Sequence, residues 1–183
     1  MMPYDHAAAG YLLAFILIKI LHPALTPDQI NSLLLWSLFW AIAVDWDMII
    51  SYGRRKSLKM SDEISHRNFL THSPLPWLVV VLLVYFLAGH LYWKYFSVAI
   101  LAGAGSHLLV DSIEFGIMWL WPFSKKRYML FDNPVTQGNP FSDEKNIFVY
   151  YAKMYRYVYM RMVTFKVGLF IVLTSLTIFF FNH

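Results

Sequence analysis

The stretch LAGAGSHLLVD, residues 101–111, joins a surface for helix packing to two ionisable side chains within one apolar run. Residues 103–106 are all small, and small residues on a membrane helix let a neighbouring helix approach closely. His107 and Asp111 are at positions i and i+4, so they project from the same face of a helix. A histidine nitrogen beside a carboxylate oxygen suits a divalent metal such as Zn²⁺ or Mn²⁺. The stretch therefore predicts a closely packed membrane helix that contributes ligands to a metal site.

The composition of the whole chain is that of a membrane protein. Of 183 residues, 58% are hydrophobic and only 14% are charged. Runs long enough to cross a bilayer, which takes about 20 residues, occur at 7–21 (marginally), 30–50, 75–92, 96–121 and 163–181. We expect an all-α fold, a polytopic membrane helical bundle of about five transmembrane helices in one integral membrane domain over residues 1–183. A soluble bundle with long core helices is the alternative. Cysteine is absent, which excludes disulfides and thiolate metal sites.

The basic residues predict the orientation of the bundle. Segments 51–74 and 122–162 are rich in lysine and arginine, whereas the connections 22–29 and 93–95 offer only Lys94. With five spans, both rich segments lie on one side of the membrane. The positive-inside rule places that side in the cytoplasm, so we expect a multi-pass protein of the cell inner membrane with a cytoplasmic N-terminus.

A second surface feature lies just before the last apolar run. Within residues 147–162, tyrosines recur at helical spacing among lysine and arginine residues. Tyrosine and basic side chains anchor helices at the membrane surface, so we expect a short interfacial helix here. A nucleic-acid patch is the alternative, but we expect no nucleic-acid partner.

Ionisable groups inside membrane spans are costly and are functional hypotheses by default. The expected topology brings several of them, together with three other histidines, to one depth near the cytoplasmic face. The candidate metal ligands are His6, Asp45, Asp47, His66, His72, His107 and Asp111. These seven exceed what one tetrahedral zinc takes, so two ions are favoured over one. A buried ion pair is the simpler interpretation of the spacing HxxxD alone, and loop histidines are usually solvated.

Asp45 and Asp47 raise a geometric question. Residues two apart are about 200° apart around an ideal helix, so both cannot face one site if the helix continues regularly. Either the helix loosens at residues 44–47, or one aspartate binds the metal and the other supports a ligand.

The block HRNFLTHS, residues 66–73, carries two of the candidate histidines beside Arg67. We expect Thr71 and Ser73 to cap the next helix or to bond ligand side chains. With this block the sequence resembles a bacterial family of membrane-bound metal-dependent hydrolases, also called LexA-binding, inner-membrane-associated hydrolases. The matching residues are His6, Asp45-Trp46-Asp47, His66-Arg67, Thr71-His72-Ser73, Ser106-His107, Asp111 and Trp121-Pro122.

The resemblance covers residues 1–125 and leaves the subfamily open. The histidine block has one residue more than the family pattern HRxxTHS, as in a sister group of predicted membrane metal-binding proteins with an HRxxxSHG block. Residues 43–44 are Ala-Val where the family usually has Leu-Pro, so the helix end here is open too.

Together, the residues and the resemblance predict a membrane-embedded metal-dependent hydrolase. We expect it to cleave a phosphoester of a lipid headgroup at the cytoplasmic face through a metal-bound water. Asp47 would be the general base and Arg67 would steady the developing charge. Zn²⁺ is the first choice of cofactor, as one or two ions, with Mn²⁺ or Fe next. The expected partners are membrane lipids, a small phosphorylated or lipid substrate and a protein on the cytoplasmic face. The alternative is a non-catalytic metal-binding membrane protein with a regulatory or protein-interaction role.

Overall fold

The computed structural model of the chain describes residues 2–55, 66–132 and 140–182. Most of these residues are helical and none of them forms a strand, which confirms the all-α class. The α-helices are α1 (Pro3–Leu21), α2 (Pro27–Ala43), α3 (Asp47–Arg55), α4 (Pro74–Leu87), α5 (Leu91–Asp111), α6 (Ile147–Lys153) and α7 (Val163–Asn182).

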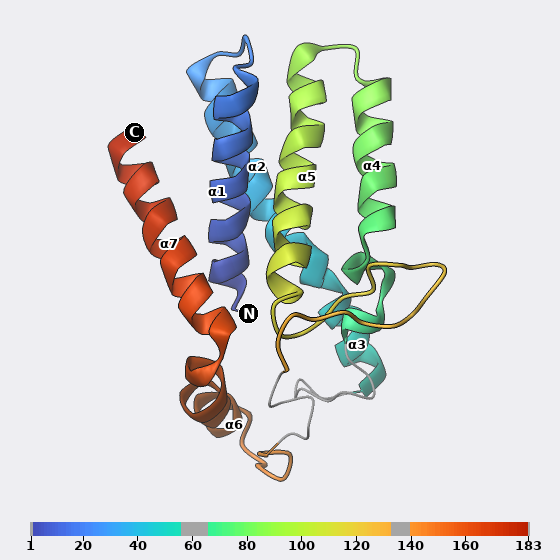
Figure 1. Ribbon diagram of the computed structural model, residues 1–183, viewed down its shortest axis with the longest axis vertical. Coiled ribbons are helices and arrows are strands. Elements are labelled where there is room, and N and C mark those ends of the chain that lie inside the picture. Colours follow the sequence, from blue (N-terminus) through green and yellow to red (C-terminus); the bar gives the residue numbers. More distant parts are fainter. Residues whose placement is uncertain (1, 56–65, 133–139, 183) are drawn as a thin grey trace.

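The long helices run side by side along one axis (Figure 1). The α1–α2 and α4–α5 connections lie at one end of the bundle, here named the turn end. The start of α1, α3, α6 and the segment after α5 lie at the other end, the loop end. The described parts of the two segments rich in lysine and arginine therefore lie at one end of the bundle, the loop end, as the sequence predicted.

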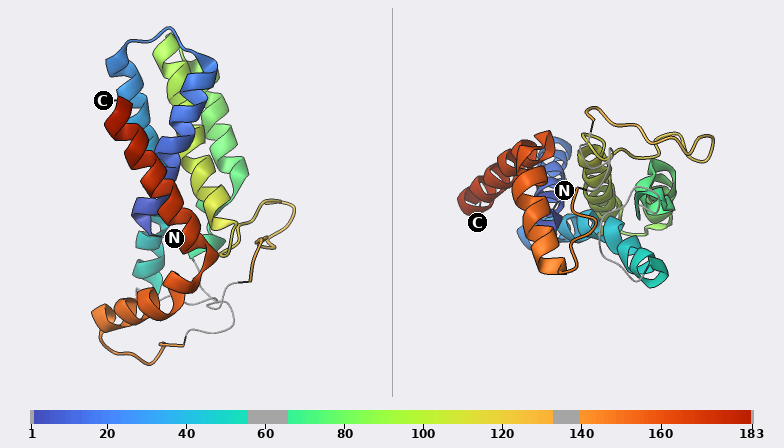
Figure 2. Two further views of the ribbon diagram at one scale, coloured as in Figure 1. Left: turned by 60° about the vertical axis from the view of Figure 1, so that its left-hand side comes forward. Right: turned by 90° about the horizontal axis from the view of Figure 1, so that it is seen from below.

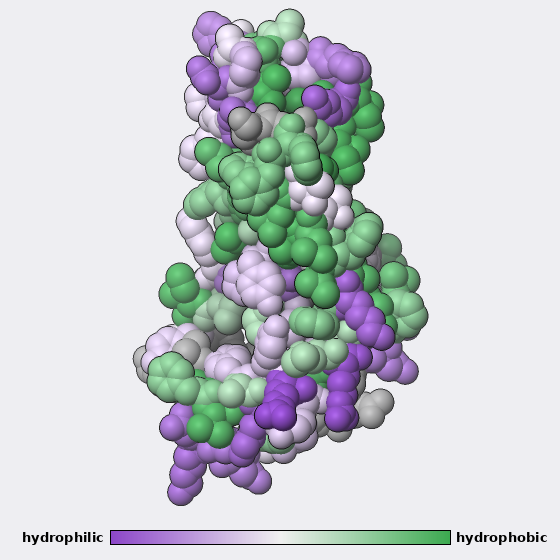
Figure 3. Space-filling view, turned by 90° about the vertical axis from the view of Figure 1, so that its left-hand side faces the viewer, coloured by the Kyte–Doolittle hydropathy of each residue, from purple (hydrophilic) through white to green (hydrophobic). Residues whose placement is uncertain are grey.

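The apolar helices form the expected membrane-spanning surface. Among the described residues, three helices are long and apolar enough to cross a membrane: Pro3–Leu21, Pro27–Ile50 and Val163–Phe181. Side chains on the face seen in Figure 3 form an apolar band with hydrophilic residues gathered at both ends. The expected count of about five spans is not confirmed. The shorter apolar helix α4 is only about 21 Å long at 1.5 Å per residue, against a hydrocarbon core of about 30 Å.

Glycines set the spacing of the three helices at the centre of the bundle. A Cβ atom added to Gly10 of α1 would lie 2.7 Å from the Ser37 carbonyl oxygen of α2, and one on Gly103 of α5 would lie 2.8 Å from the Ala41 nitrogen. Both helices therefore pack directly on the α2 backbone. The expectation of close approach around residues 103–106 holds for Gly103 but not for Gly105, where an added Cβ atom would meet no other atom within 4 Å.

Two helices end differently from the apolar runs. Regular α2 stops at Ala43 and passes through a 3-10 turn, Val44–Trp46, into α3, so the chain does loosen where the two aspartates lie. Helix α5, which corresponds to the apolar run 96–121, ends at Asp111 and not at residue 121 as that run suggested. The amides of Phe115 and Gly116 both donate to the Asp111 carbonyl, and Gly116 has a positive φ of 75°, which glycine adopts easily.

The segment before α7 is helical, as predicted. It consists of α6, a π-helical turn at Met154–Val158 and a 3-10 turn at Tyr159–Arg161. In Figure 2 this segment lies across the loop end of the bundle. Its position at a membrane surface stays a prediction.

Two buried carboxylates fasten this C-terminal part to the rest of the chain. Asp5 of α1 accepts hydrogen bonds from the Tyr159 hydroxyl and, at 3.1 Å, from the Met2 amide. Glu114 accepts from the backbone amides of Val163 and Thr164, at 3.1 and 2.7 Å, and so caps the start of α7. No sequence pattern had singled out these pairings.

Candidate metal centre

Five of the seven candidate ligands meet at the loop end of the bundle. His6 comes from the first turn of α1, Asp45 from the 3-10 turn after α2, His72 from a 3-10 turn at Leu70–His72, and His107 and Asp111 from α5. Only Asp45 keeps a noticeable exposed fraction, 17% of its side chain. The cluster is therefore a buried site with one side chain that reaches solvent.

Four donor atoms lie at distances that suit one small ion. His72 Nε2 is 3.3 Å from Asp45 Oδ1 and 3.9 Å from Asp111 Oδ2. His107 Nε2 is 3.5 Å from the same Asp45 oxygen and 3.8 Å from the same Asp111 oxygen. Two ligands bound tetrahedrally to zinc at 2.0–2.1 Å are about 3.4 Å apart, so these four nitrogen–oxygen distances are close to those between ligands of one ion.

The His107 ring has its orientation set by the α2 backbone. Its Nδ1 lies 2.7 Å from the Ala41 carbonyl oxygen, which can only accept, so Nδ1 carries the proton and donates. In a neutral ring Nε2 then holds a lone pair that faces the carboxylates of Asp45 and Asp111. Within the described residues Nε2 makes no hydrogen bond. A lone pair facing two carboxylates is repulsive unless a proton or a metal ion lies between them, so this arrangement is compatible with a metal ion.

His72 is held in a similar way from behind. Its Nδ1 lies 3.0 Å from Asp47 Oδ2, and the Thr71 hydroxyl donates to the same oxygen. A histidine that donates one ring nitrogen to a carboxylate and offers the other to a metal is a common arrangement. Asp47 therefore supports a candidate ligand, while Asp45 faces the donor cluster. The helix loosens at this point, and the two aspartates also have different roles.

The carboxylates around His72 outweigh the effect of burial on its pKa. Burial alone lowers the pKa of His72, but its hydrogen bonds with Asp45 and Asp47 and the charge of Asp111 raise the pKa overall. Thr71 donates to Asp47, one of the seven candidate ligands, and does not cap the next helix. Ser73 lies at the N-cap of α4 without a side-chain cap bond and instead donates to the Leu70 carbonyl at 2.8 Å.

His6 completes the cluster on the α1 side. Its Nε2 lies 3.5 Å from Asp111 Oδ1, and its ring stacks on the His107 ring with centroids 3.7 Å apart. Two triads of possible ligands result, His6–His107–Asp111 and Asp45–His72–His107, which share His107. The structure thus brings five of the seven candidate ligands together, and their binding of a metal stays a prediction. The His66 side chain lies outside the described part of the structure.

Arg67 contacts a carboxylate of the cluster, and its expected role in steadying a developing charge stays a prediction. Its Nε donates to Asp111 Oδ2 at 2.7 Å, and its guanidinium lies 4.2 Å from the centre of the Phe115 ring. Burial alone lowers the pKa of Arg67, but the nearby carboxylates, Asp111 first, raise it overall, so the side chain is charged. A guanidinium suits carboxylate and phosphate equally, and the sequence could not tell which one it meets.

Comparison with known proteins gives a family match over nearly the whole chain. One family model matches residues 1–182, including the C-terminal part that the motifs did not reach. The chain belongs to the YdjM inner membrane protein family. Membership in YdjM and the three apolar helices support an inner-membrane location. The YdjM description names no reaction, and no curated protein and no solved structure matches the chain.

Proposed function

We propose that the protein is a metal-dependent hydrolase of the inner membrane that cleaves a phosphoester of a lipid headgroup at the cytoplasmic face. The observation that carries the proposal is the convergence of His72, His107, Asp45 and Asp111 at metal-ligand spacing, with the His107 lone pair turned toward two carboxylates. Nitrogen and oxygen donors in this number suit Zn²⁺ first, and Mn²⁺ or Fe next.

The geometry favours a single ion among these donors, rather than the two that the count of seven candidate ligands suggested. Nδ1 of His107 is bonded to the Ala41 carbonyl, so the ring has one nitrogen left. Both triads use His107, and one lone pair binds one ion. Metal analysis of the purified protein distinguishes one ion per chain from two.

The roles of the surrounding residues follow from their contacts. A bound divalent ion would polarise a phosphoryl oxygen and make a water more acidic. Asp47 would orient His72, because its Oδ2 accepts a hydrogen bond from Nδ1–H. Arg67 would hold Asp111 and balance its charge. Asp45, the most exposed residue of the cluster, marks the side from which substrate and water would enter.

The substrate class follows from the level of the site along the bundle. The cluster lies at the loop end, beside the end of the apolar span Pro27–Ile50. A lipid headgroup in the adjacent leaflet would reach this level, so a phospholipid or isoprenoid phosphate is favoured over a soluble nucleotide.

A non-catalytic metal-binding role is the second candidate, and the burial of the site favours it. His72, His107 and Asp111 are wholly buried, and metal sites closed by four protein ligands are usually structural. Such a protein would use the loop end to hold a partner protein.

The deciding experiment combines metal analysis with turnover. Purified protein in detergent would be loaded with Zn²⁺, Mn²⁺ or Mg²⁺ and given phosphatidic acid, diacyl phospholipids, undecaprenyl phosphates and a generic phosphodiester. His107→Ala should lose metal and turnover, while His90→Ala, on an exposed residue at the turn end of the same helix, should keep both. Bound metal without turnover of any substrate would support the non-catalytic role. Full metal retention in His107→Ala would remove the basis of both.

A further inference from the structure

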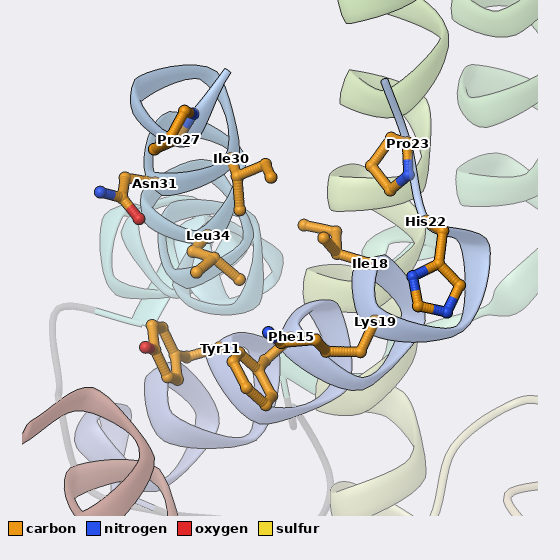
Figure 4. A pocket seen from close by; sticks show the side chains of 10 residues that line it. All are labelled: Tyr11, Phe15, Ile18, Lys19, His22, Pro23, Pro27, Ile30, Asn31 and Leu34. Carbon is orange, nitrogen blue, oxygen red and sulfur yellow. The ribbon is translucent and has the colours of Figure 1, made fainter. Parts of the chain in front are cut away.

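A cavity lies far from the metal centre, between α1 and α2 at the turn end (Figure 4). Its volume is about 420 Å³, within the range of roughly 300–1,000 Å³ typical of small-molecule sites. Phe15 and Ile18 of α1 and Leu34 of α2 form its apolar walls. Its polar lining consists of Lys19 and His22, at the end of α1, and Asn31. The cavity is thus apolar along its length and polar towards the connection between the two helices.

The apolar part continues along the bundle. A neighbouring cavity of about 270 Å³ shares Tyr11 with the first and is lined by Leu38 of α2 and by Val172, Leu176 and Phe179 of α7. The two cavities border each other at Tyr11 and are here named together the α1–α2 groove. Their lining residues extend along α1 from Lys19 at the turn end past Tyr11.

The charge at the mouth of the groove indicates which headgroup it would accept. Lys19 is the basic residue in the last turn of α1, and its ammonium lies 5.3 Å from the centre of the Phe15 ring. It makes no ion pair within residues 2–55, 66–132 and 140–182. An unpaired ammonium above an apolar groove complements a negatively charged headgroup above an acyl chain.

We propose that the α1–α2 groove binds one phospholipid with an anionic headgroup, one of its acyl chains along Ile18, Leu34 and Tyr11 and its phosphate at Lys19. The lipid comes from the leaflet opposite to the metal centre, because Lys19 lies at the turn end. The site is therefore separate from that of the proposed hydrolysis and does not depend on it.

Native mass spectrometry of the purified, metal-loaded protein tests the proposal. Protein in a neutral detergent would be titrated with dioleoylphosphatidylglycerol or dioleoylphosphatidylcholine. One bound lipid and a preference of about fivefold for the anionic lipid are expected, since a lysine near an anionic headgroup contributes about 1 kcal/mol. Lys19→Gln should abolish the preference but keep binding. Lys94→Gln, which removes an exposed lysine at the same end outside the groove, should leave the preference unchanged.

A second variant tests the acyl-chain part of the groove. Ile30 lines the cavity and is only partly buried, so Ile30→Trp should fill the groove and should lower the affinity for both lipids. Metal content and monodispersity report that each variant is folded. Equal effects of Lys19→Gln and Lys94→Gln, or unchanged lipid binding in Ile30→Trp, would overturn the proposal and leave only lipids bound without a specific site.

Discussion

Replacing Asp47 with asparagine separates three roles that a buried aspartate beside a metal centre can have. The side chain is almost wholly buried, and its Oδ2 bonds both the Thr71 hydroxyl and Nδ1 of His72. Asparagine keeps the shape and an acceptor oxygen but removes the negative charge that makes the imidazole a better donor to a metal. We therefore expect the zinc dissociation constant to rise 10- to 100-fold, the usual cost of losing a partner that supports a metal-bound histidine. This corresponds to about 1.4–2.7 kcal/mol of binding free energy.

Zinc competition with a chromophoric chelator, followed by metal analysis at saturation, measures this effect. The number of ions bound at saturation should be unchanged, and any hydrolytic activity should return when zinc is raised above the new dissociation constant. Asp143→Asn, at an exposed aspartate of the loop end, provides the matched control and should leave the affinity unchanged. Loss of bound zinc even at saturation would make Asp47 a direct ligand. Unchanged affinity with activity lost at every zinc concentration would make it the general base, and either result refutes the supporting role.

Three further predictions concern packing and protonation. Tyr159→Phe removes the buried hydroxyl that donates to Asp5, so the free energy of unfolding should fall by about 1.5–3 kcal/mol in a thermal melt in detergent, and an unchanged melting temperature would contradict the contact. Gly103→Ala should lower the melting temperature, because the added methyl group would meet the α2 backbone. Gly105→Ala, where space is open, should leave the melting temperature unchanged. Equal melting temperatures for the two variants would contradict the packing. Zinc affinity should increase as the pH rises through the raised pKa of His72 and level off above it, because the proton on the metal-free ring must leave before the metal binds. Titration by calorimetry measures this affinity. If the affinity does not depend on pH between pH 6 and pH 9, His72 is not a ligand.

Local patterns predicted the parts of the centre that lie on one helix. His107 and Asp111 share a face because helical geometry brings positions i and i+4 together, and this needed no knowledge of the fold. Basic residues placed the histidine block and the first turn of α1 at the same end, so the meeting of His6 with α5 was also within reach. The spacing of Asp45 and Asp47 showed that a regular helix was unsuitable there, and the structure has a 3-10 turn at that point.

Other features depended on partners that are distant in the sequence. The Ala41 carbonyl that orients His107 looks like any other backbone group of an apolar helix. Arg67 could have met a substrate or a ligand carboxylate, and only the fold brings it to Asp111. The apolar run after Asp111 suggested a longer helix, because hydrophobicity alone does not show where a helix ends. Here it ends where two backbone amides donate to the Asp111 carbonyl.

The two buried carboxylates that hold the C-terminal part have a mechanical consequence. Asp5 directly precedes His6, and Glu114 follows Asp111 by three positions, so each fastening point lies beside a candidate metal ligand. Helix α7 and the segment before it cannot shift relative to the bundle without breaking buried hydrogen bonds to these carboxylates or pulling on both ligands. Lateral pressure of the bilayer on α7, or traction on the segment 147–162, would thus be transmitted to the neighbouring candidate ligands His6 and Asp111 at once.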